Sequence, residues 1–435
     1  MTIFFLGYFD KFSRFFYKID LELSREFKDL KSKYYSTQLS GFFYSFLRLK
    51  RSIPITFSSW FNVLFNRKKY LKIIEQNQTY KGINFESLIQ FHEKLDNGIP
   101  RRHLLLQAIS YIDILNKQFS KNRPDVVIMI GDSRLFFEVS KAIAIKFDVK
   151  VYFIEQGPFD TTIFNSQGVN ANMKVDQNHQ FKNHNVTTKI TQLISNKNNQ
   201  KYNRSYVYRG LDFLVDKLLH KTILYPPDLK STDIFQLPLN KTADKPIISK
   251  NKQHLFLLIL QVPQDVNMIL HSPNFSNHFD IVKQCFENLP EHSKLVIREH
   301  PVYKGKYKQK LYDYAYENNI EFDHSDNATK IINLSDVVIV NNSTIGVKVL
   351  SMYKPLIVLG NSYYSDSNIC LVYQSGDDLK DYLLKALTFQ PEKQNIDTFL
   401  LNLEYTHLVS GKIIDKHLSA ATEIANRIKI SHFND

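Results

Sequence analysis

Residues 294–301 read KLVIREHP and residues 337–346 read VVIVNNSTIG, and these two stretches decide the fold that the sequence predicts. Each begins with an apolar run typical of a strand that is buried on both faces, and each ends in polar side chains. A third apolar run, PLIVLG, follows at residues 355–360. In an open parallel sheet, ligands bind beyond the carboxyl ends of the strands. We therefore expect the polar residues that follow these strands to form a binding site.

The polar residues after the second run suit a phosphate group. Asn342, Ser343 and Thr344 would offer an amide, two hydroxyls and backbone N–H donors, and Gly346 would leave room for a close approach. The alternative is structural, because Ser343 can instead cap the helix that follows it. The sequence alone leaves both interpretations open.

Strand and helix patterns alternate through most of the chain, which is typical of α/β domains. A strand–helix–strand unit is predicted in residues 125–154, and a longer series of such units begins at residue 254. Residues 239–253, rich in Lys, Asn and Thr, are typical of a linker. We predict two Rossmann-like α/β domains, residues 1–240 and 254–435, that face a central cleft.

Three other segments carry weaker patterns. Residues 36–90 are predicted to form helices and loops without a clear period, and residues 171–205 are predicted to form loops with one short helix. The last 60 residues are predicted to be mostly helical, and a final helix can return to the first domain in two-domain proteins of this kind.

Composition limits the class of protein. A chain of 435 residues with 43% hydrophobic and 13% aromatic residues is long and apolar enough to fold into two or three domains. With Cys285 and Cys370 as its two cysteines, the sequence suggests neither a disulfide framework nor a cysteine-based zinc site. The start of the chain lacks the basic region of a secretory signal, and no run approaches the roughly 20 apolar residues of a membrane span. We expect a cytoplasmic protein.

Positive charge is concentrated near the start of the chain. The formal net charge is +13, and residues 1–70 contain 13 Lys/Arg against 5 Asp/Glu. Aromatic residues such as Trp60 and Phe61 are interleaved with these cations. This pattern fits a solvated basic face over an aromatic core, or a surface that binds an anionic membrane. Nucleic acid is the least favoured partner because no nucleic-acid-binding motif is present.

Five motifs occur together between about Glu155 and Asp366, and as a set they resemble the bacterial capsule polysaccharide biosynthesis family. The resemblance implies a GT-B-like fold and the activity of a retaining β-Kdo glycosyltransferase that uses CMP-Kdo. The motifs are Glu155-Gln-Gly-Pro158 with Gln167-Gly-Val-Asn170, Gln261-Val-Pro-Gln-Asp265, Arg298-Glu-His-Pro301, Asn342-Ser-Thr-Ile-Gly346, and Pro355-Leu-Ile-Val-Leu-Gly360 with Tyr363 or Tyr364.

The resemblance also implies which residues bind the donor. His300 and Pro301 match the pair expected to hold the cytidine, while Ser343 and Thr344 match the group expected to bind the CMP phosphate. The other donor-binding residues expected from these motifs are Gln261, Arg298 and Asn342. From the residues alone, Arg298 could bind an anionic sugar carboxylate or be a surface charge, and a strand-end histidine before a proline can be purely structural.

Two carboxylates are the candidate catalytic residues. Asp265 matches the nucleophile, and Glu155 matches an acid/base or a carboxylate that positions the acceptor; two displacements by such groups retain configuration. Structural alternatives are that Asp265 caps the following helix and that Glu155 pairs with a nearby Arg or Lys. The family often has an acidic residue where this chain has Lys348, which puts the ribose contact in question. No cofactor is expected, and no metal is predicted because the sequence has no Asp-x-Asp pair.

The sequence thus leads to one functional hypothesis and two alternatives. The hypothesis is a glycosyltransferase that moves Kdo or a related acidic sugar from a CMP donor to a glycolipid or capsule-linker acceptor. It would be a cytoplasmic protein, peripheral on the inner face of the bacterial inner membrane, with anionic lipid and other capsule-assembly proteins as partners and no nucleic acid. The alternatives are a transferase or epimerase that uses a UDP-sugar, and a non-catalytic, membrane-associated scaffold for capsule assembly.

Overall fold

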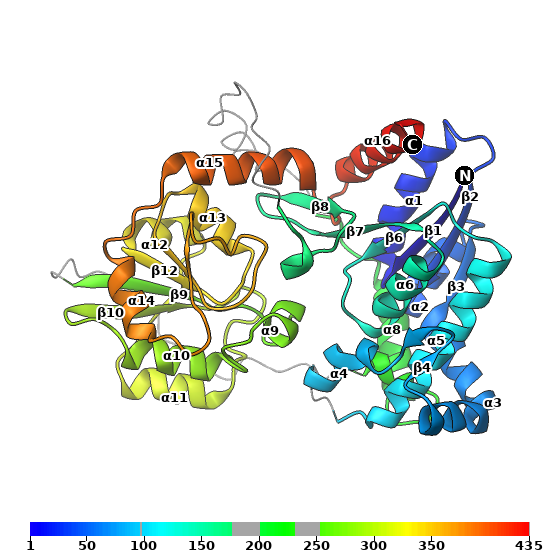
Figure 1. Ribbon diagram of the computed structural model, residues 1–435, viewed down its shortest axis with the longest axis horizontal. Helices are drawn as coiled ribbons and strands as arrows, with labels where there is room; N and C mark the ends of the chain where they lie inside the picture. The colour runs from blue at the N-terminus through cyan, green and yellow to red at the C-terminus, as the bar shows by residue number, and fades with distance from the viewer. Residues whose placement is uncertain (96–97, 176–200, 231–252, 435) are drawn as a thin grey trace. The chain divides into compact units, whose positions relative to one another are not determined.

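The computed structural model describes residues 1–95, 98–175, 201–230 and 253–434. These residues form two compact units, each with its own sheet and core (Figure 1). The N-terminal unit contains residues 1–169, 201–230 and 406–434, and the C-terminal unit contains residues 170–175 and 253–405.

The N-terminal unit is built on a seven-stranded sheet. Its strands are β1 (Thr2–Gly7), β2 (Lys31–Ser36), β3 (Arg51–Pro54), β6 (Val126–Ile130), β7 (Lys150–Gln156), β8 (Thr161–Asn165) and β15 (Leu408–Ser410). They lie in the order β15, β8, β7, β6, β1, β2, β3, parallel from β7 to β3, with β8 and β15 each antiparallel to its inner neighbour. Connections reverse direction between β1 and β6, so the carboxyl ends of these two strands form the switch point where such sheets bind ligands.

Helices cover both faces of this sheet, and a two-stranded hairpin of β4 (Thr79–Tyr80) and β5 (Ile83–Asn84) lies outside it. The helices are α1 (Asp10–Ser24), α2 (Leu39–Phe46), α3 (Ile55–Gln76), α4 (Gln90–Leu95), α5 (Arg101–Lys121), α6 (Leu135–Lys146), α8 (Tyr206–Leu219) and α16 (Ser419–Asn434). None of the described helices is both long and apolar enough to cross a membrane.

The C-terminal unit contains a six-stranded, fully parallel sheet in the order β11, β10, β9, β12, β13, β14. Its strands are β9 (His254–Ile259), β10 (Ser293–Arg298), β11 (Glu321–Asp323), β12 (Val337–Val340), β13 (Leu356–Val358) and β14 (Leu371–Val372). The helices are α9 (Val266–Leu270), α10 (His278–Glu287), α11 (Gln309–Glu317), α12 (Ala328–Leu334), α13 (Ile345–Ser351), α14 (Leu379–Ala386) and α15 (Lys393–Asn402). In chain order this is the 3-2-1-4-5-6 arrangement of a Rossmann sheet, with its switch point between β9 and β12.

The predicted α/β class with two Rossmann-like domains is confirmed, and each strand predicted in residues 254–360 is present. In residues 36–90, however, the prediction of helices and loops missed β3, which is a short strand at the edge of the sheet. The predicted linker and most of residues 171–205 lie outside the described residues. The predicted cleft between the domains stays a prediction.

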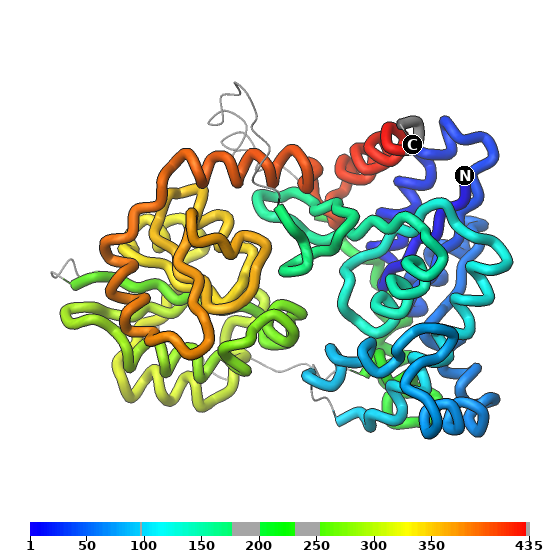
Figure 2. The backbone as a smooth tube through the Cα atoms, in the orientation of Figure 1, coloured from blue at the N-terminus to red at the C-terminus, as the bar shows by residue number. Residues whose placement is uncertain are grey.

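The end of the chain belongs to the N-terminal unit, whereas the sequence analysis assigned all of residues 254–435 to the second domain. β15 extends the N-terminal sheet beside β8, and Figure 2 shows the chain ending next to α1. The reason is a stripe of small and apolar residues on α16 that packs into the same core as Phe15 and Ile19 of α1. That stripe comprises Ala420, Ala421, Ile424, Ala425 and Ile428.

A buried carboxylate ties the segment after α8 to α5. Asp228 accepts hydrogen bonds from Tyr111 Oη at 2.5 Å and from Gln107 Nε2 at 2.8 Å, and its backbone N–H donates to Gln107 Oε1 at 3.0 Å. Burial raises the pKa of Asp228 to about 6, although these hydrogen bonds act in the opposite direction.

The raised pKa of Asp228 predicts a pH dependence of stability. Between pH 3.8, the ordinary pKa, and about 6, the folded chain holds a proton that the unfolded chain has lost. The free energy of unfolding should therefore fall as pH rises through this window, by on the order of 3 kcal/mol from this group, and stay level above it. The measurement is denaturant unfolding of the wild type and of Asp228→Asn at several pH values. The difference between their free energies of unfolding at each pH gives the contribution of Asp228. Parallel profiles for the two proteins would contradict it.

Candidate functional site

A pocket of about 460 Å³ lies in the C-terminal unit at the carboxyl ends of β9, β10 and β12. Residues that follow each of these strands line it, so the pocket occupies the switch point of the Rossmann sheet. Of the nine predicted site residues, the structure brings together seven around this pocket: Gln261, Asp265, Arg298, His300, Pro301, Ser343 and Thr344. Strand-end positions predicted this grouping for the polar residues after β10 and β12, the family resemblance added Gln261 and Asp265, and the chemical roles of all seven stay predictions.

His300 is held by the loop that follows β10. Its backbone N–H donates to Tyr307 Oη at 3.2 Å, and its ring Nδ1 accepts from the backbone N–H of Val302 at 3.3 Å. Because Nδ1 is an acceptor, the proton of the neutral ring lies on Nε2, which is then a donor. Burial lowers the pKa of His300, and the Asp265 carboxylate acts in the opposite direction. The neutral form is therefore favoured near pH 7, so His300 can donate a hydrogen bond without carrying a charge.

Asp265 is both a helix cap and a pocket residue, the two interpretations that the sequence left open. Its side chain caps α9 by accepting a hydrogen bond from the backbone N–H of Asn267 at 3.0 Å, as the structural alternative predicted. The same residue lines the pocket and is close enough to His300 to influence its pKa. Capping thus orients the carboxylate and does not remove it from the pocket.

Gln261 and Asn342 form a buried amide pair that joins the ends of β9 and β12. Gln261 Nε2 donates to Asn342 Oδ1 at 2.9 Å, and Gln261 Oε1 accepts from the Asn342 backbone N–H at 3.4 Å. Asn342 Nδ2 donates to the carbonyl oxygens of Asn267 and His271, each at 2.8 Å. The side-chain amide of Asn342 therefore fixes α9 to the end of the sheet, and Asn342 does not itself line the pocket.

Ser343 and Thr344 line the pocket at the start of α13. The first helical residue is Ile345, its N-cap is Thr344, and no side-chain bond caps the helix. The alternative that Ser343 only caps its own helix is therefore wrong. The backbone of Ser343 is fixed instead, because its carbonyl oxygen accepts from Tyr364 Oη and from the Gly346 backbone N–H.

Arg298 is not a surface charge. It is buried, its guanidinium pairs with Asp323, and it donates to Ser325 Oγ at 3.0 Å. Lys348 also lines the pocket, and burial together with repulsion from Arg298 lowers its pKa. Two cationic side chains thus border the pocket, together with the carboxylates of Asp265, Glu299 and Asp326.

The loop after β11 forms a wall of the pocket that the sequence did not predict. Asp326, Asn327 and Ala328 line the pocket, and Asn327 caps α12 by accepting from the Thr329 backbone N–H at 2.9 Å. Strand-end reasoning applied to the short strand at Glu321 would have found them. The position of Lys348 in the lining had no sequence signal beyond its departure from the family pattern.

Glu155 lies in the N-terminal unit, near the end of β7 and beside the switch point of that sheet. Its Oε1 accepts from the backbone N–H of Gln156 at 3.0 Å. Burial raises the pKa of Tyr8; Arg134 acts to lower this pKa, and Glu155 acts to raise it further. Burial lowers the pKa of Lys11, and Glu155 acts in the opposite direction. A catalytic part for Glu155 stays a prediction.

The structure defines an α/β protein with a pocket at the switch point of its C-terminal sheet. The family described as "Capsule polysaccharide biosynthesis protein" matches residues 125–374, more than half of the chain, and the chain belongs to this family.

Individual relatives are distant. Protein FixF of Sinorhizobium fredii (strain NBRC 101917 / NGR234) is 24% identical over 370 residues, covering 83% of this chain and 80% of FixF. The structure of Thermosulfurimonas dismutans KpsC, a beta Kdo 2,7 transferase, is 14% identical, with a TM-score of 0.39 and coverage of 74% of this chain and 89% of that one. The UDP-GlcNAc 2-epimerase of Methanocaldococcus jannaschii is 14% identical, with a TM-score of 0.32 and coverage of 99% and 100%.

Gly346 provides a test of how the pocket is supported. A Cβ at this position would lie 2.5 Å from the ring of Tyr364, which is fully buried. We expect Gly346→Ala to lower the free energy of unfolding by about 1–3 kcal/mol, because a packed ring cannot move aside. Gly210→Ala is the control: it lies inside α8 with no atom within 4 Å of the added Cβ, and should raise stability by about 0.5–1 kcal/mol. Equal denaturant midpoints for Gly346→Ala and wild type would contradict the close packing of the Tyr364 ring against Gly346.

Proposed function

We propose that this chain is a glycosyltransferase of capsular polysaccharide biosynthesis that moves Kdo or a related acidic sugar from a CMP donor to a lipid-linked saccharide acceptor. The observation that carries the proposal is the convergence of His300, Ser343, Thr344 and Asp265 on one pocket at the switch point of a Rossmann sheet. Membership of the capsule polysaccharide biosynthesis family supports the choice of pathway.

The pocket chemistry suits a nucleotide joined to an acidic sugar. In our proposal, His300 and Pro301 hold the cytosine nucleoside, with the Nε2–H of His300 as a donor, and the hydroxyls of Ser343 and Thr344 bind the phosphate. Lys348 adds a positive charge for the phosphate or the sugar carboxylate. A cation at this position replaces the acidic residue expected for a ribose hydroxyl, so the ribose would be held by other groups.

Transfer with retention would take two displacements. In the first, a carboxylate oxygen of Asp265 attacks the anomeric carbon, the bond from that carbon to the CMP oxygen breaks, and CMP leaves with the bonding electrons. In the second, an acceptor hydroxyl attacks the same carbon and expels Asp265, while a base takes the hydroxyl proton. Glu155 is our candidate for that base. The hydrogen bond from Asn267 would hold Asp265 in one orientation for attack.

We further propose that the protein acts at the cytoplasmic face of the bacterial inner membrane, where a lipid-linked acceptor would be found. The support is the excess of Lys and Arg in residues 1–70, which suits anionic lipid headgroups.

Nucleotide binding is the first test. CMP should raise the melting temperature of the wild type in a concentration-dependent manner, and UDP should do so much more weakly. His300→Ala and Ser343→Ala should each weaken CMP binding by about tenfold, because each removes a hydrogen bond to the ligand. Tyr316→Ser, at an exposed position on α11, is the control and should bind CMP like wild type. Preference for UDP would favour a UDP-sugar enzyme, and binding of neither nucleotide would favour a non-catalytic scaffold.

Turnover of CMP-Kdo with a lipid-linked acceptor tests the nucleophile. Asp265→Asn should lower turnover by about a thousandfold or more, since an amide cannot form the glycosyl intermediate, while CMP affinity stays within about threefold of wild type. Unchanged turnover in this variant would remove Asp265 from the mechanism.

A further inference from the structure

Helix α8 of the N-terminal unit presents apolar side chains to the outside. Val207, Phe213, Leu214 and Leu218 are 78%, 57%, 52% and 63% exposed, and none of the 14 residues of the helix is fully buried. Val207, Leu214 and Leu218 are spaced by seven and four residues and share one stripe of the helix, and Phe213 lies one residue, or about 100°, round the helix from Leu214. The side of α8 that packs on the unit is apolar too, because Tyr208, Leu211, Val215 and Leu219 are half-buried, so α8 carries apolar side chains on both its inner and its outer side.

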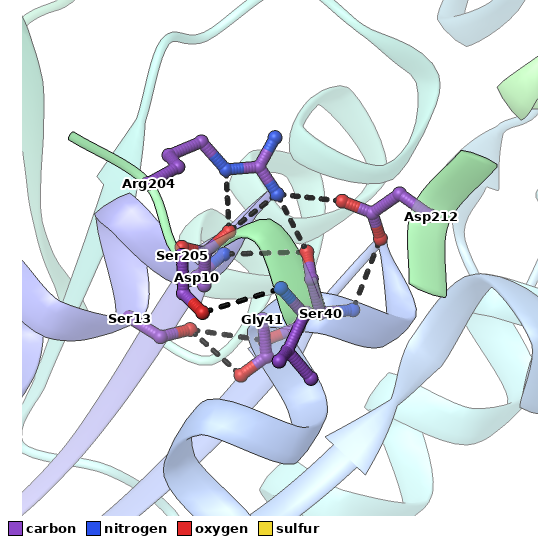
Figure 3. Close-up of polar contacts among 9 residues, drawn as sticks. Asp10, Ser13, Ser40, Gly41, Arg204, Ser205 and Asp212 are labelled. Atoms are coloured by element: carbon purple, nitrogen blue, oxygen red, sulfur yellow. Dashed lines mark hydrogen bonds and ion pairs between the residues drawn. The ribbon is translucent and has the colours of Figure 1, made fainter. Parts of the chain in front are cut away.

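Polar contacts hold the start of α8 in this orientation. Arg204, just before the helix, pairs with Asp10 of α1 and with Asp212 of α8, and donates to Ser40 Oγ at 3.2 Å (Figure 3). Asp212 also accepts from the Ser40 backbone N–H at 3.2 Å. These polar contacts fix the start of α8 against α1 and α2, while the exposed apolar side chains lie on its outer side.

The segment after α8 is anchored in the same unit and adds to the exposed apolar surface. Trp60 Nε1 on α3 donates to the carbonyl oxygen of Ile223 at 2.6 Å, while the Ile223 side chain remains 61% exposed. Tyr225 Oη donates to Asp216 Oδ1 at 2.8 Å, which ties this segment back to the helix. We call Val207, Phe213, Leu214, Leu218 and Ile223 the α8 face.

Exposed cations outnumber exposed carboxylates around the α8 face, since Asp216 is the exposed carboxylate of this helix. Arg209, Lys217 and Lys221 are exposed, whereas Asp212 is paired with Arg204 and Asp216 accepts from Tyr225. In the same unit, residues 30–74 contain nine Lys/Arg and no Asp/Glu. An apolar face bordered by cations complements a bilayer that contains anionic lipids. A second copy of the chain fits less well, since a two-fold pairing of this face would bring its lysines together.

We propose that α8 lies in the headgroup region of an anionic lipid bilayer, with the α8 face buried among the acyl chains and Lys217 and Lys221 against the lipid phosphates. The proposal deepens the membrane association included in the proposed function and rests on it. It assigns the contact to a helix outside the basic segment of residues 1–70, and it does not depend on the nucleotide pocket.

Vesicle flotation tests the contact. The full-length wild type should float with vesicles of phosphatidylglycerol and phosphatidylcholine, and much less with phosphatidylcholine alone. The double variant Phe213→Ser, Leu218→Ser should reduce the apparent affinity at least tenfold, because each buried apolar side chain contributes on this scale. The matched control is Val302→Ser, Tyr316→Ser, which removes two still more exposed apolar side chains from the C-terminal unit and should float like wild type.

Insertion itself can be read from fluorescence. Phe213→Trp should be quenched by lipids brominated on the acyl chain when anionic vesicles are added, beyond the signal of Trp60 in the wild type, whereas Tyr316→Trp should not. Vesicle binding that the α8 double variant leaves intact would overturn the proposal, and so would a wild type that fails to bind anionic vesicles. If light scattering shows a wild-type dimer that the double variant abolishes, the α8 face pairs with a second copy and the proposal is also overturned.

The nucleotide assay keeps this result separate from the proposed activity. The α8 double variant should retain the shift in melting temperature with CMP. A wild type that binds vesicles through α8 but gives no shift with any nucleotide would contradict the proposed catalysis and leave the membrane contact standing.

Discussion

The buried amide pair between Gln261 and Asn342 is the interaction on which the pocket depends. It joins the two strands between which the chain reverses direction, and it extends through Asn342 to the carbonyl oxygens of α9. Each of these polar groups is taken out of water, so an unsatisfied partner would be costly and the strand ends are held in one arrangement. Asp265 at the start of α9 and Ser343 after β12 are thereby fixed on either side of the pair. The sheet thus sets where the pocket lies, and the loops and helices that follow its strands line it.

Much of the C-terminal unit could be predicted because its signals are strong. Runs of three or more consecutive apolar residues in β9, β10 and β12 predict buried parallel strands, and the polar residues that follow must gather at one edge. The same logic could not reveal what each polar residue does there. Asn342 and Ser343 are polar neighbours in the sequence. The side chain of Asn342 makes hydrogen bonds inside the protein, whereas Ser343 lines the pocket. That difference depends on α9 and Tyr364, which approach only in the folded chain.

The N-terminal unit was harder to predict because its edge is poorly marked. β3 is four residues long, at the edge of the sheet, and ends in Pro54, so neither apolar alternation nor length distinguishes it from a loop. The pairing of Arg298 with Asp323 shows a second limit: the partners are 25 residues apart, and only the parallel register of β10 and β11 brings them together. From the sequence, Arg298 was interpreted as an anion-binding residue or a surface charge. In the structure its side chain is buried and paired with Asp323.

The return of α16 to the N-terminal unit links the first and last residues of the chain in one folding unit. Phe15 and Ile19 near the start acquire their covering side chains only after nearly the entire polypeptide has been synthesised. A ribosome-bound nascent chain would therefore carry an uncovered apolar surface on α1 while the second unit is already complete and able to fold. Shortening the gene from its 3′ end would leave the same surface exposed, and a circular permutant that starts at α15 would close it early.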